Sequence, residues 1–264
     1  MNWQDRGEEG LKMLRARHSV RAFEERGVAE DILRELKADI TMANTHVAGL
    51  HFTLITDDPD PFRGFSKSYG VFRNVRNYLA CVVDTSFPDY REKAGFYAEQ
   101  FAVKATSLGL GTCFVGGTYD ASSIKVQLRA DWKILFVVVF GYPLDNERPL
   151  ARFMTRMLHR KDPDARSFFA GTDSEYREAC DLFPWLPTAL EALACAPSSL
   201  NKRPVKIAFR KEGSGSTSVG NICAYVDASN PKNLSDLGIA KYNMSAVMPE
   251  EGIWEWGNNA PFLL

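Results

Sequence analysis

The order of secondary-structure elements that the sequence predicts occurs twice along this chain of 264 residues. In the first half, an apolar stripe typical of a helix over 29–40 is followed by an apolar strand over 51–55. In the second half, a predicted helix over 185–196 leads in the same way to a strand over 205–209. A chain that repeats its elements in this way is expected to fold as two similar halves.

Shorter signals further along the chain support the repeat, at an offset of 143 where the first helix and strand align at an offset of 155. Asp84 and Asp227 each end an apolar strand, and Gly95 and Gly238 each lie near the start of a predicted helix; the members of each pair are 143 positions apart. Two halves packed about a pseudo-two-fold axis would let one chain imitate a symmetric homodimer. The alternative is chance, because the same order of helices and strands occurs in many α/β proteins.

The expected architecture is α+β. The apolar run from Ile134 to Phe140 predicts a strand that is covered on both faces. From 159 to 181 the chain turns polar, which places the connection between the halves there. We therefore expect a first half of residues 1–160 and a shorter second half of residues 161–264, intertwined in one globular unit.

Composition excludes several classes of function. A net charge of -1 provides no general electrostatic attraction to nucleic acid, and the longest apolar run is far shorter than the roughly 20 residues of a membrane helix. The polar, acidic start does not resemble a secretory signal, so a cytoplasmic location is expected. Five scattered cysteines without a Cys-x-x-Cys pair are read as reduced thiols, and four scattered histidines predict no metal site.

Two short polar segments are candidates for an anion or cofactor site. Arg17, Ser19 and Arg21 occupy every second position, so in an extended segment their side chains project to one side as donors for a phosphate. The second segment, Pro-Ser-Ser-Leu-Asn at 197–201, brings hydroxyl and amide groups together. The alternatives are a solvated surface stretch for the first segment and an ordinary helix end and turn for the second.

Four segments together resemble the FMN-dependent nitroreductase family, and within it a single-chain, duplicated branch. They are Arg-His-Ser-x-Arg-x-Phe at 17–23, the Leu-Gly-Leu-Gly-Thr segment that ends in Gly-Gly at 107–117, Phe-Gly-Tyr-Pro at 140–143, and Pro-Ser-Ser-Leu-Asn-Lys-Arg-Pro at 197–204. The resemblance implies a three-layer α/β/α sandwich in which two homologous halves form an intramolecular pseudo-dimer. It implies a monomer, with further homodimerisation left open.

The resemblance also assigns residues to the cofactor. Arg17 and Ser19 would hold the phosphate and ribityl end of FMN, with His18 in the same motif, and Arg21 would lie near the pyrimidine edge. Further residues that the family pattern implies as FMN contacts are Gly116 and Gly117 beside the ring, Arg148 near the phosphate, and, from the second half, Pro197, Ser198, Ser199 and Asn201.

The order of these motifs is unusual for the family. Ordinary members carry the Pro-Ser loop roughly 25 residues after the arginine motif, beyond one helix. Here that place reads Met-Ala-Asn-Thr-His at 42–46, and the loop occurs in the second half instead. The resemblance therefore implies one intact FMN site and one degenerate site in each chain.

The implied activity is that of an FMN-dependent NAD(P)H oxidoreductase. Hydride from NADH or NADPH would reach N5 of a tightly bound FMN and then pass, in a ping-pong reaction, to a nitroaromatic, a quinone or a similar small acceptor. No protein side chain is expected to act as acid, base or nucleophile. The alternatives are a member whose reduced flavin reacts with oxygen or a halogenated aromatic, a flavin-binding protein without turnover, and an interaction scaffold without flavin.

Five further polar or aromatic side chains have two readings each. Tyr119, Trp254 and Trp256 are either walls of a substrate cavity or core residues. Arg73 and Asn77 either face the ribityl chain or substrate, or are surface groups before a strand.

Overall fold

The computed structural model describes residues 3–63, 71–144, 163–212 and 219–264. The chain divides into two compact units, each assembled from separate segments. Unit 1 comprises residues 1–15, 91–99 and 160–264, and unit 2 comprises residues 16–90 and 100–159. No helix in the described part of the chain combines the length and the apolar character that crossing a bilayer requires.

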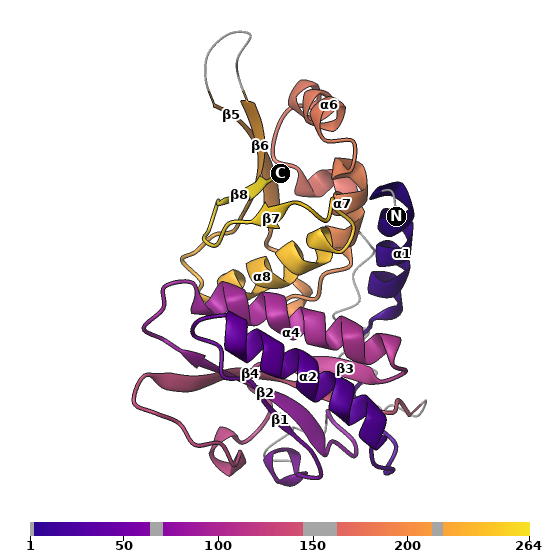
Figure 1. Ribbon diagram of the computed structural model, residues 1–264, viewed down its shortest axis with the longest axis vertical. Coiled ribbons are helices and arrows are strands. Elements are labelled where there is room, and N and C mark those ends of the chain that lie inside the picture. Colours follow the sequence, from indigo (N-terminus) through magenta and orange to yellow (C-terminus); the bar gives the residue numbers. More distant parts are fainter. Residues whose placement is uncertain (1–2, 64–70, 145–162, 213–218) are drawn as a thin grey trace. The chain divides into compact units, whose positions relative to one another are not determined.

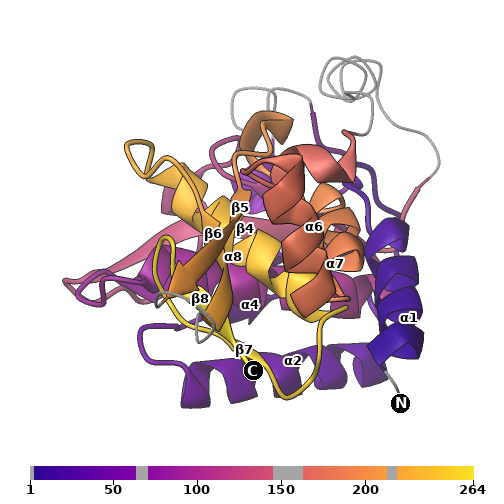
Figure 2. The ribbon, with the colours of Figure 1, turned by 90° about the horizontal axis from the view of Figure 1, so that it is seen from above.

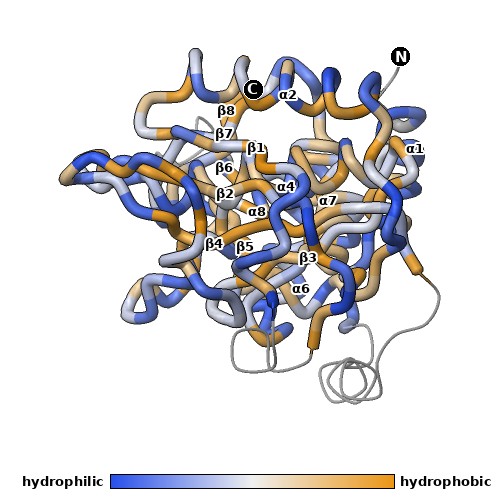
Figure 3. The backbone as a smooth tube through the Cα atoms, turned by 90° about the horizontal axis from the view of Figure 1, so that it is seen from below, coloured by the Kyte–Doolittle hydropathy of each residue, from blue (hydrophilic) through white to orange (hydrophobic). Residues whose placement is uncertain are grey.

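Unit 2 is built on a four-stranded antiparallel sheet (Figure 1). Its strands are β1 (Thr53–Ile55), β2 (Asn77–Asp84), β3 (Gly111–Val115) and β4 (Trp132–Gly141), in the spatial order β1-β2-β4-β3. The apolar run in β4 stands out in the hydropathy colouring (Figure 3). Phe136 to Phe140 are buried, so the prediction that this strand is covered on both faces is confirmed for these residues.

The helices of unit 2 follow from apolar periodicity. Helix α2 (Glu30–His46) buries Leu33, Leu36 and Ile40 at helical spacing. Helix α4 (Tyr90–Ser107) is shared between the units, and its residues from 100 onwards belong to unit 2. Short 3₁₀ turns, η1 (Asp60–Phe62) and η2 (Ala121–Ser123), complete the connections. A core cluster that includes Val20, Phe62, Tyr78 and Val139 packs against the sheet.

Unit 1 holds the other described elements, seen from a second direction in Figure 2. Its complete helices are α6 (Asp173–Leu182), α7 (Leu186–Ala194) and α8 (Lys232–Ser245). It also contains α1 (Trp3–Ala16) up to residue 15, and residues 91–99 of α4. Its strands are β5 (Lys206–Glu212), β6 (Val219–Tyr225), β7 (Ile253–Trp254) and β8 (Pro261–Leu263), and two 3₁₀ turns are η3 (Ala165–Phe168) and η4 (Ser199–Asn201).

The second sheet repeats the topology of the first. It is antiparallel with the order β5-β6-β8-β7, and each strand takes the place of the strand four numbers earlier in β1-β2-β4-β3. In both sheets a helix, α4 or α8, lies in sequence between the second and third strands. The predicted α+β class is confirmed, and the repeat of elements seen in the sequence is a repeat of chain topology.

Within unit 1, the start of α4 and helix α8 cross through two glycines. A Cβ built on Gly95 would lie 2.0 Å from the carbonyl oxygen of Ser235, and one built on Gly238 would lie 1.8 Å from the carbonyl oxygen of Glu92. Ser235 and Glu92 are separated by the same 143 positions as Gly238 and Gly95. Gly95 and Gly238 are thus equivalent positions in the two copies, and the residues that they face, Ser235 and Glu92, are equivalent as well. Such a reciprocal pair of contacts is expected of a local two-fold relation.

A buried ion pair ties α8 to the start of α4. The ammonium of Lys241, 0% exposed, donates to Glu92 Oε1 at 2.5 Å and to the carbonyl oxygens of Glu255 and Gly257 at 2.9 and 3.2 Å. The other carboxylate oxygen of Glu92 accepts the Gly257 N–H at 2.7 Å. Burial lowers the pKa of Lys241, and the Glu92 carboxylate opposes that shift. Three oxygen acceptors fix the position of the ammonium.

Candidate functional site

The Arg17–Arg21 segment in unit 2 lies extended beside β3. Ser19 forms a parallel bridge with Thr112, and the Val20 N–H donates to the Thr112 carbonyl at 2.8 Å. On its other side, the Arg73 N–H donates to the Arg21 carbonyl at 2.9 Å. The backbone is thus held from two directions, and the segment has the extended conformation under which the spacing of its polar residues was considered.

Two glycines let this segment approach the sheet. Gly111 and Gly141 are directly opposed on β3 and β4. A Cβ on Gly111 would lie 2.6 Å from Val20 Cγ2, and a Cβ on Gly141 would lie 3.1 Å from Phe23 Cδ1. Val20 and Phe23 therefore pack into space that a side chain at either position would occupy.

The side chains of the segment alternate in part. Val20 and Ala22 are buried at 7% and 1% exposed, whereas Ser19 and Arg21 are partly exposed. Arg17 is buried at 9% exposed, which is unusual for a guanidinium and shows that it is not part of a solvated surface stretch. His18 is exposed, with Nδ1 3.1 Å from the Ala16 carbonyl oxygen.

Gly116 and Gly117 follow directly after β3 and are exposed. Neither has a positive φ, and no atom of the described chain lies within 4 Å of a Cβ built on either residue. Neither turn geometry nor packing within the protein thus demands a glycine here. Gly116 comes four residues after Thr112, about 13 Å along an extended strand, so these glycines lie well apart from the Ser19 bridge.

In unit 1, the Pro197–Asn201 loop connects α7 to β5 and has an unusual backbone. Leu200, Asn201 and Arg203 have φ values of 54°, 52° and 51°, although none of them is glycine. Left-handed conformations of this kind cost free energy for residues with a Cβ, and they concentrate at functional sites. Leu200 is 62% exposed at the centre of the loop.

Polar contacts hold this loop in place. The Arg203 N–H donates to Ser198 Oγ at 2.8 Å, and the Ser199 N–H donates to both carboxylate oxygens of Asp236, at 3.1 Å to Oδ1 and 3.2 Å to Oδ2. The Ser198 oxygen acts as acceptor in its bond, so its hydroxyl hydrogen can still be donated to a ligand. The Ser199 N–H, which the motif suggested as a flavin donor, is directed to Asp236 instead.

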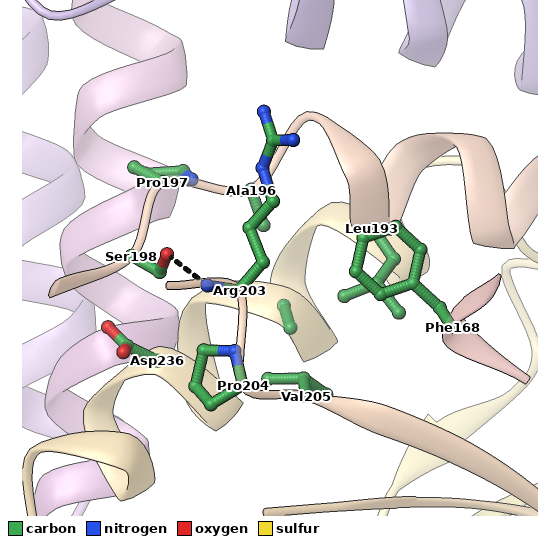
Figure 4. A pocket seen from close by; sticks show the side chains of 10 residues that line it. Phe168, Leu193, Ala196, Pro197, Ser198, Arg203, Pro204, Val205 and Asp236 are labelled. Atoms are coloured by element: carbon green, nitrogen blue, oxygen red, sulfur yellow. Dashed lines mark hydrogen bonds between the residues drawn. The ribbon is translucent and has the colours of Figure 1, made fainter. Parts of the chain in front are cut away.

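A small cavity lies beneath the loop (Figure 4). Its volume is about 10 Å³, enough for about one water molecule, and its wall includes Phe168, Leu193, Ser198, Arg203 and Asp236. Figure 4 shows the guanidinium of Arg203 pointing away from Asp236. Burial, opposed by the Ser199 hydrogen bond, raises the pKa of Asp236 to about 7.

Arg148, which the motifs also implied as a phosphate contact, lies outside the described residues.

The aromatic residues considered as walls of a substrate cavity pack against other rings. Tyr119 packs against Phe62 at a ring-centroid distance of 6.1 Å, and burial raises its pKa to about 12. Trp254 is buried against Phe262, with ring centroids 5.2 Å apart, in the core of unit 1.

Trp256 is partly exposed and contacts the rings of Phe96 and Tyr97. The reading of Asn77 as a surface group was wrong: its side chain is 4% exposed, and Oδ1 accepts the Asp57 N–H at 3.2 Å. Arg73 is partly exposed, and its backbone pairs with the arginine segment.

Sequence reasoning missed Asp236 and Thr112. Asp236 lies two residues before Gly238, near the start of a predicted helix, and a lone Asp there carries no signal that its carboxylate binds a backbone N–H in a distant loop. Thr112 is 0% exposed, and its hydroxyl has no hydrogen-bond partner among the described residues. Its position inside the Leu-Gly-Leu-Gly-Thr motif was the available signal.

Comparison with protein families decides the assignment. A family model described as "Putative TM nitroreductase" matches residues 10–248. The chain belongs to this nitroreductase family. Membership confirms the resemblance that the motifs indicated and makes the protein an oxidoreductase enzyme. A comparison with curated proteins found no match.

Solved structures of nitroreductases are similar to this family member. A crystal structure of a "putative nitroreductase" from Thermotoga maritima MSB8 is 21% identical, covers 96% of this chain and 91% of its own, and has a TM-score of 0.57. A nitroreductase with bound FMN from Bacteroides fragilis NCTC 9343 is 17% identical, covers 62% of this chain and 99% of its own, and has a TM-score of 0.47. The Thermotoga match confirms the predicted nitroreductase fold.

Proposed function

We propose that this protein is an FMN-dependent NAD(P)H oxidoreductase that reduces a nitroaromatic, a quinone or a similar small acceptor. The observation that carries the proposal is the arginine segment in unit 2. Arg17 is buried although it carries a charge, and Ser19 and Arg21 lie on the same extended backbone, which β3 and Arg73 hold in place. A buried cation with neighbouring donors suits a phosphate, and phosphate distinguishes FMN from flavins without one.

The glycines after β3 support a ligand longer than a phosphate. Gly116 and Gly117 lie about 13 Å along the strand from the Ser19 bridge and leave open space where side chains would project. Phosphate-binding donors at one end of β3 and bare backbone at the other suit an elongated molecule that has an anionic end and a flat ring. The buried hydroxyl of Thr112 lies at the Ser19 bridge, at the same end of β3 as the arginine segment.

We assign the following tasks to the chain's own residues. Arg17 and Ser19, with His18 and Arg148 of the implied set, bind the phosphate and ribityl end, and Arg21 binds the pyrimidine edge. Gly116 and Gly117 present backbone to the ring. From unit 1, the proposed ligands are Pro197, Ser198, Ser199 and Asn201; of these, Ser198 retains a hydroxyl hydrogen to donate, whereas the Ser199 N–H is bound to Asp236.

FMN supplies the hydride-transfer chemistry when bound, so the protein needs no acid, base or nucleophile of its own. The residues named above bind and orient the ring, and the cation of Arg21 favours negative charge at the edge that it contacts. We further propose that the protein acts as a monomer, because each chain already contains both copies of the repeated topology. A cytoplasmic location, expected from the sequence, is part of the same proposal.

The decisive test is a visible absorption spectrum. The purified protein is incubated with FMN, desalted, and then treated anaerobically with NADPH or NADH. Retained flavin that is bleached supports the proposed function, and retained flavin that neither nucleotide bleaches supports a binding protein without turnover. If no flavin is retained and FMN does not raise the melting temperature, the proposed site is wrong.

A further inference from the structure

Asp236, in α8, is a buried acidic side chain to which the proposed function assigns no task. Its side chain is 6% exposed, and both carboxylate oxygens accept the backbone N–H of Ser199. Burying a carboxylate costs free energy that an apolar residue would avoid. The hydrogen bonds from the Ser199 N–H offset part of that cost and join the carboxylate to the loop.

The loop that Asp236 holds is strained. Leu200, Asn201 and Arg203 all adopt left-handed conformations without being glycine. A loop in this state relaxes unless its surroundings hold it, because each such residue favours another conformation. The Ser198–Arg203 bond is internal to the loop, whereas the Ser199–Asp236 bond joins the loop to a long helix.

We propose that Asp236 is a positioning residue of the flavin site: by accepting the Ser199 N–H, it holds the Pro197–Asn201 loop in the conformation that binds FMN. The inference rests on the proposed function. Asp236 acts through Ser199 and has no contact with cofactor assigned to it. Its effect is to reduce the cost of ordering the loop when FMN binds.

The surroundings of Asp236 make its charge responsive to pH. Of the side chains that line the cavity with it, Arg203 is the charged one, and its guanidinium points away (Figure 4). On the α4 segment that crosses α8, the Glu92 carboxylate is bonded to Lys241, and Lys93 lies 5.9 Å from the Trp256 ring. Burial, not a neighbouring charge, sets the pKa of Asp236 to about 7.

Two substitutions separate the acceptor from the charge. Asp236→Asn keeps a carbonyl oxygen for the Ser199 N–H but cannot ionise, and Asp236→Ala removes the acceptor. Asp227→Asn is the matched control. Asp227 is also in unit 1, and its carboxylate also accepts a backbone N–H, that of Ser229, but the residue is exposed. Circular dichroism verifies that each variant is folded.

The experiment measures the FMN dissociation constant of each variant by quenching of flavin fluorescence at pH 6 and pH 8. Loss of the hydrogen bond in Asp236→Ala is expected to weaken FMN binding about tenfold or more at pH 8. The ratio of wild-type to Asp236→Asn affinity is expected to rise about fivefold from pH 6 to pH 8, because an ionised acceptor bonds more strongly. The phosphate of FMN titrates equally in both proteins and cancels in that ratio.

A second readout needs no flavin. Hydrogen exchange of the Ser199 amide in the cofactor-free protein is expected to be faster in Asp236→Ala than in the wild type and unchanged in Asp227→Asn. If wild-type protein does not bind FMN, the proposed function fails whatever the exchange data show. If wild-type protein binds FMN but Asp236→Ala binds it equally well, or Ser199 exchange is unaltered, the inference about Asp236 is overturned.

Discussion

At the scale of single residues, Gly116 and Gly117 are informative because nothing in the described chain requires them to be glycine. Their φ values are ordinary for any residue, and a Cβ on either would meet open space. Gly27 has the same open surroundings, so the lack of neighbours does not by itself indicate a ligand; what distinguishes Gly116 and Gly117 is their place directly after β3, at the proposed site. A substitution at either position therefore tests ligand binding without a packing defect in the protein itself.

Gly117→Ala is therefore expected to leave the stability of the cofactor-free protein unchanged and to weaken FMN binding about tenfold or more, through a steric conflict with the ligand. Thermal unfolding and flavin titration measure the two effects. Gly27→Ala, also in open space, is the control and should change neither quantity. Equal FMN affinity in Gly117→Ala would remove this residue from the site.

Asp236 makes the free energy of unfolding depend on pH. Its pKa in the folded protein is about 7, above the value of about 3.9 in an unfolded chain, so the folded state binds more protons between these values. Stability is then greatest below pH 4 as far as this group is concerned, and it falls as pH rises towards 7. The contribution is on the order of 4 kcal/mol at most, at about 1.4 kcal/mol per pH unit.

Asp236→Asn should abolish that dependence. The variant is expected to unfold at a higher denaturant concentration than the wild type at pH 8 and at a similar concentration at pH 4, because only the wild type carries a buried charge at pH 8. Urea unfolding at the two pH values measures the difference. Parallel pH profiles for both proteins would show that Asp236 ionises normally.

At the scale of elements, the extended arginine segment depends on the surface beneath it. Val20 and Phe23 pack over Gly111 and Gly141, a directly opposed pair on neighbouring strands. The sequence analysis considered the segment in an extended conformation, and the structure adds the reason that it lies against β3: two missing side chains provide the space.

Gly111→Ala should disturb this element. The added methyl would lie 2.6 Å from Val20, so the segment must shift, at a cost of about 1–3 kcal/mol in stability. We expect a lower melting temperature together with weaker FMN binding. Val20→Ala in the same chain makes room for the methyl and should restore part of the FMN affinity; no recovery would mean that the segment is not displaced by this contact.

At the scale of the whole molecule, the repeated sheet topology contrasts with the unequal sequence of the two copies. Where the first copy would carry the Pro-Ser loop, the side chain of Asn44 bonds the Phe52 backbone in both directions, at 2.8 Å each. This closed pair joins the end of α2 to the residue before β1. An amide used in this way serves the fold of its own unit, which supports the expectation of a degenerate second site.

We therefore predict one FMN for each chain. Titration of cofactor-free protein with FMN, followed by absorbance after desalting and by calorimetry, should reach saturation at a ratio close to one. Arg17→Ala should lower the affinity without revealing a second class of sites. A ratio of two would show that the first copy of the topology also supports a complete flavin site.

The sequence by itself determined the α+β class, the repeat of elements and the family, because apolar periodicity and short motifs are local properties of the chain. It placed the strand at 134–140 correctly for the same reason. Only the tertiary structure showed that Asp236 holds Ser199, that Lys241 is buried on Glu92, and that Asn77 is buried. These depend on contacts between residues far apart in sequence, and a single polar residue does not indicate which distant group will satisfy it once water is excluded.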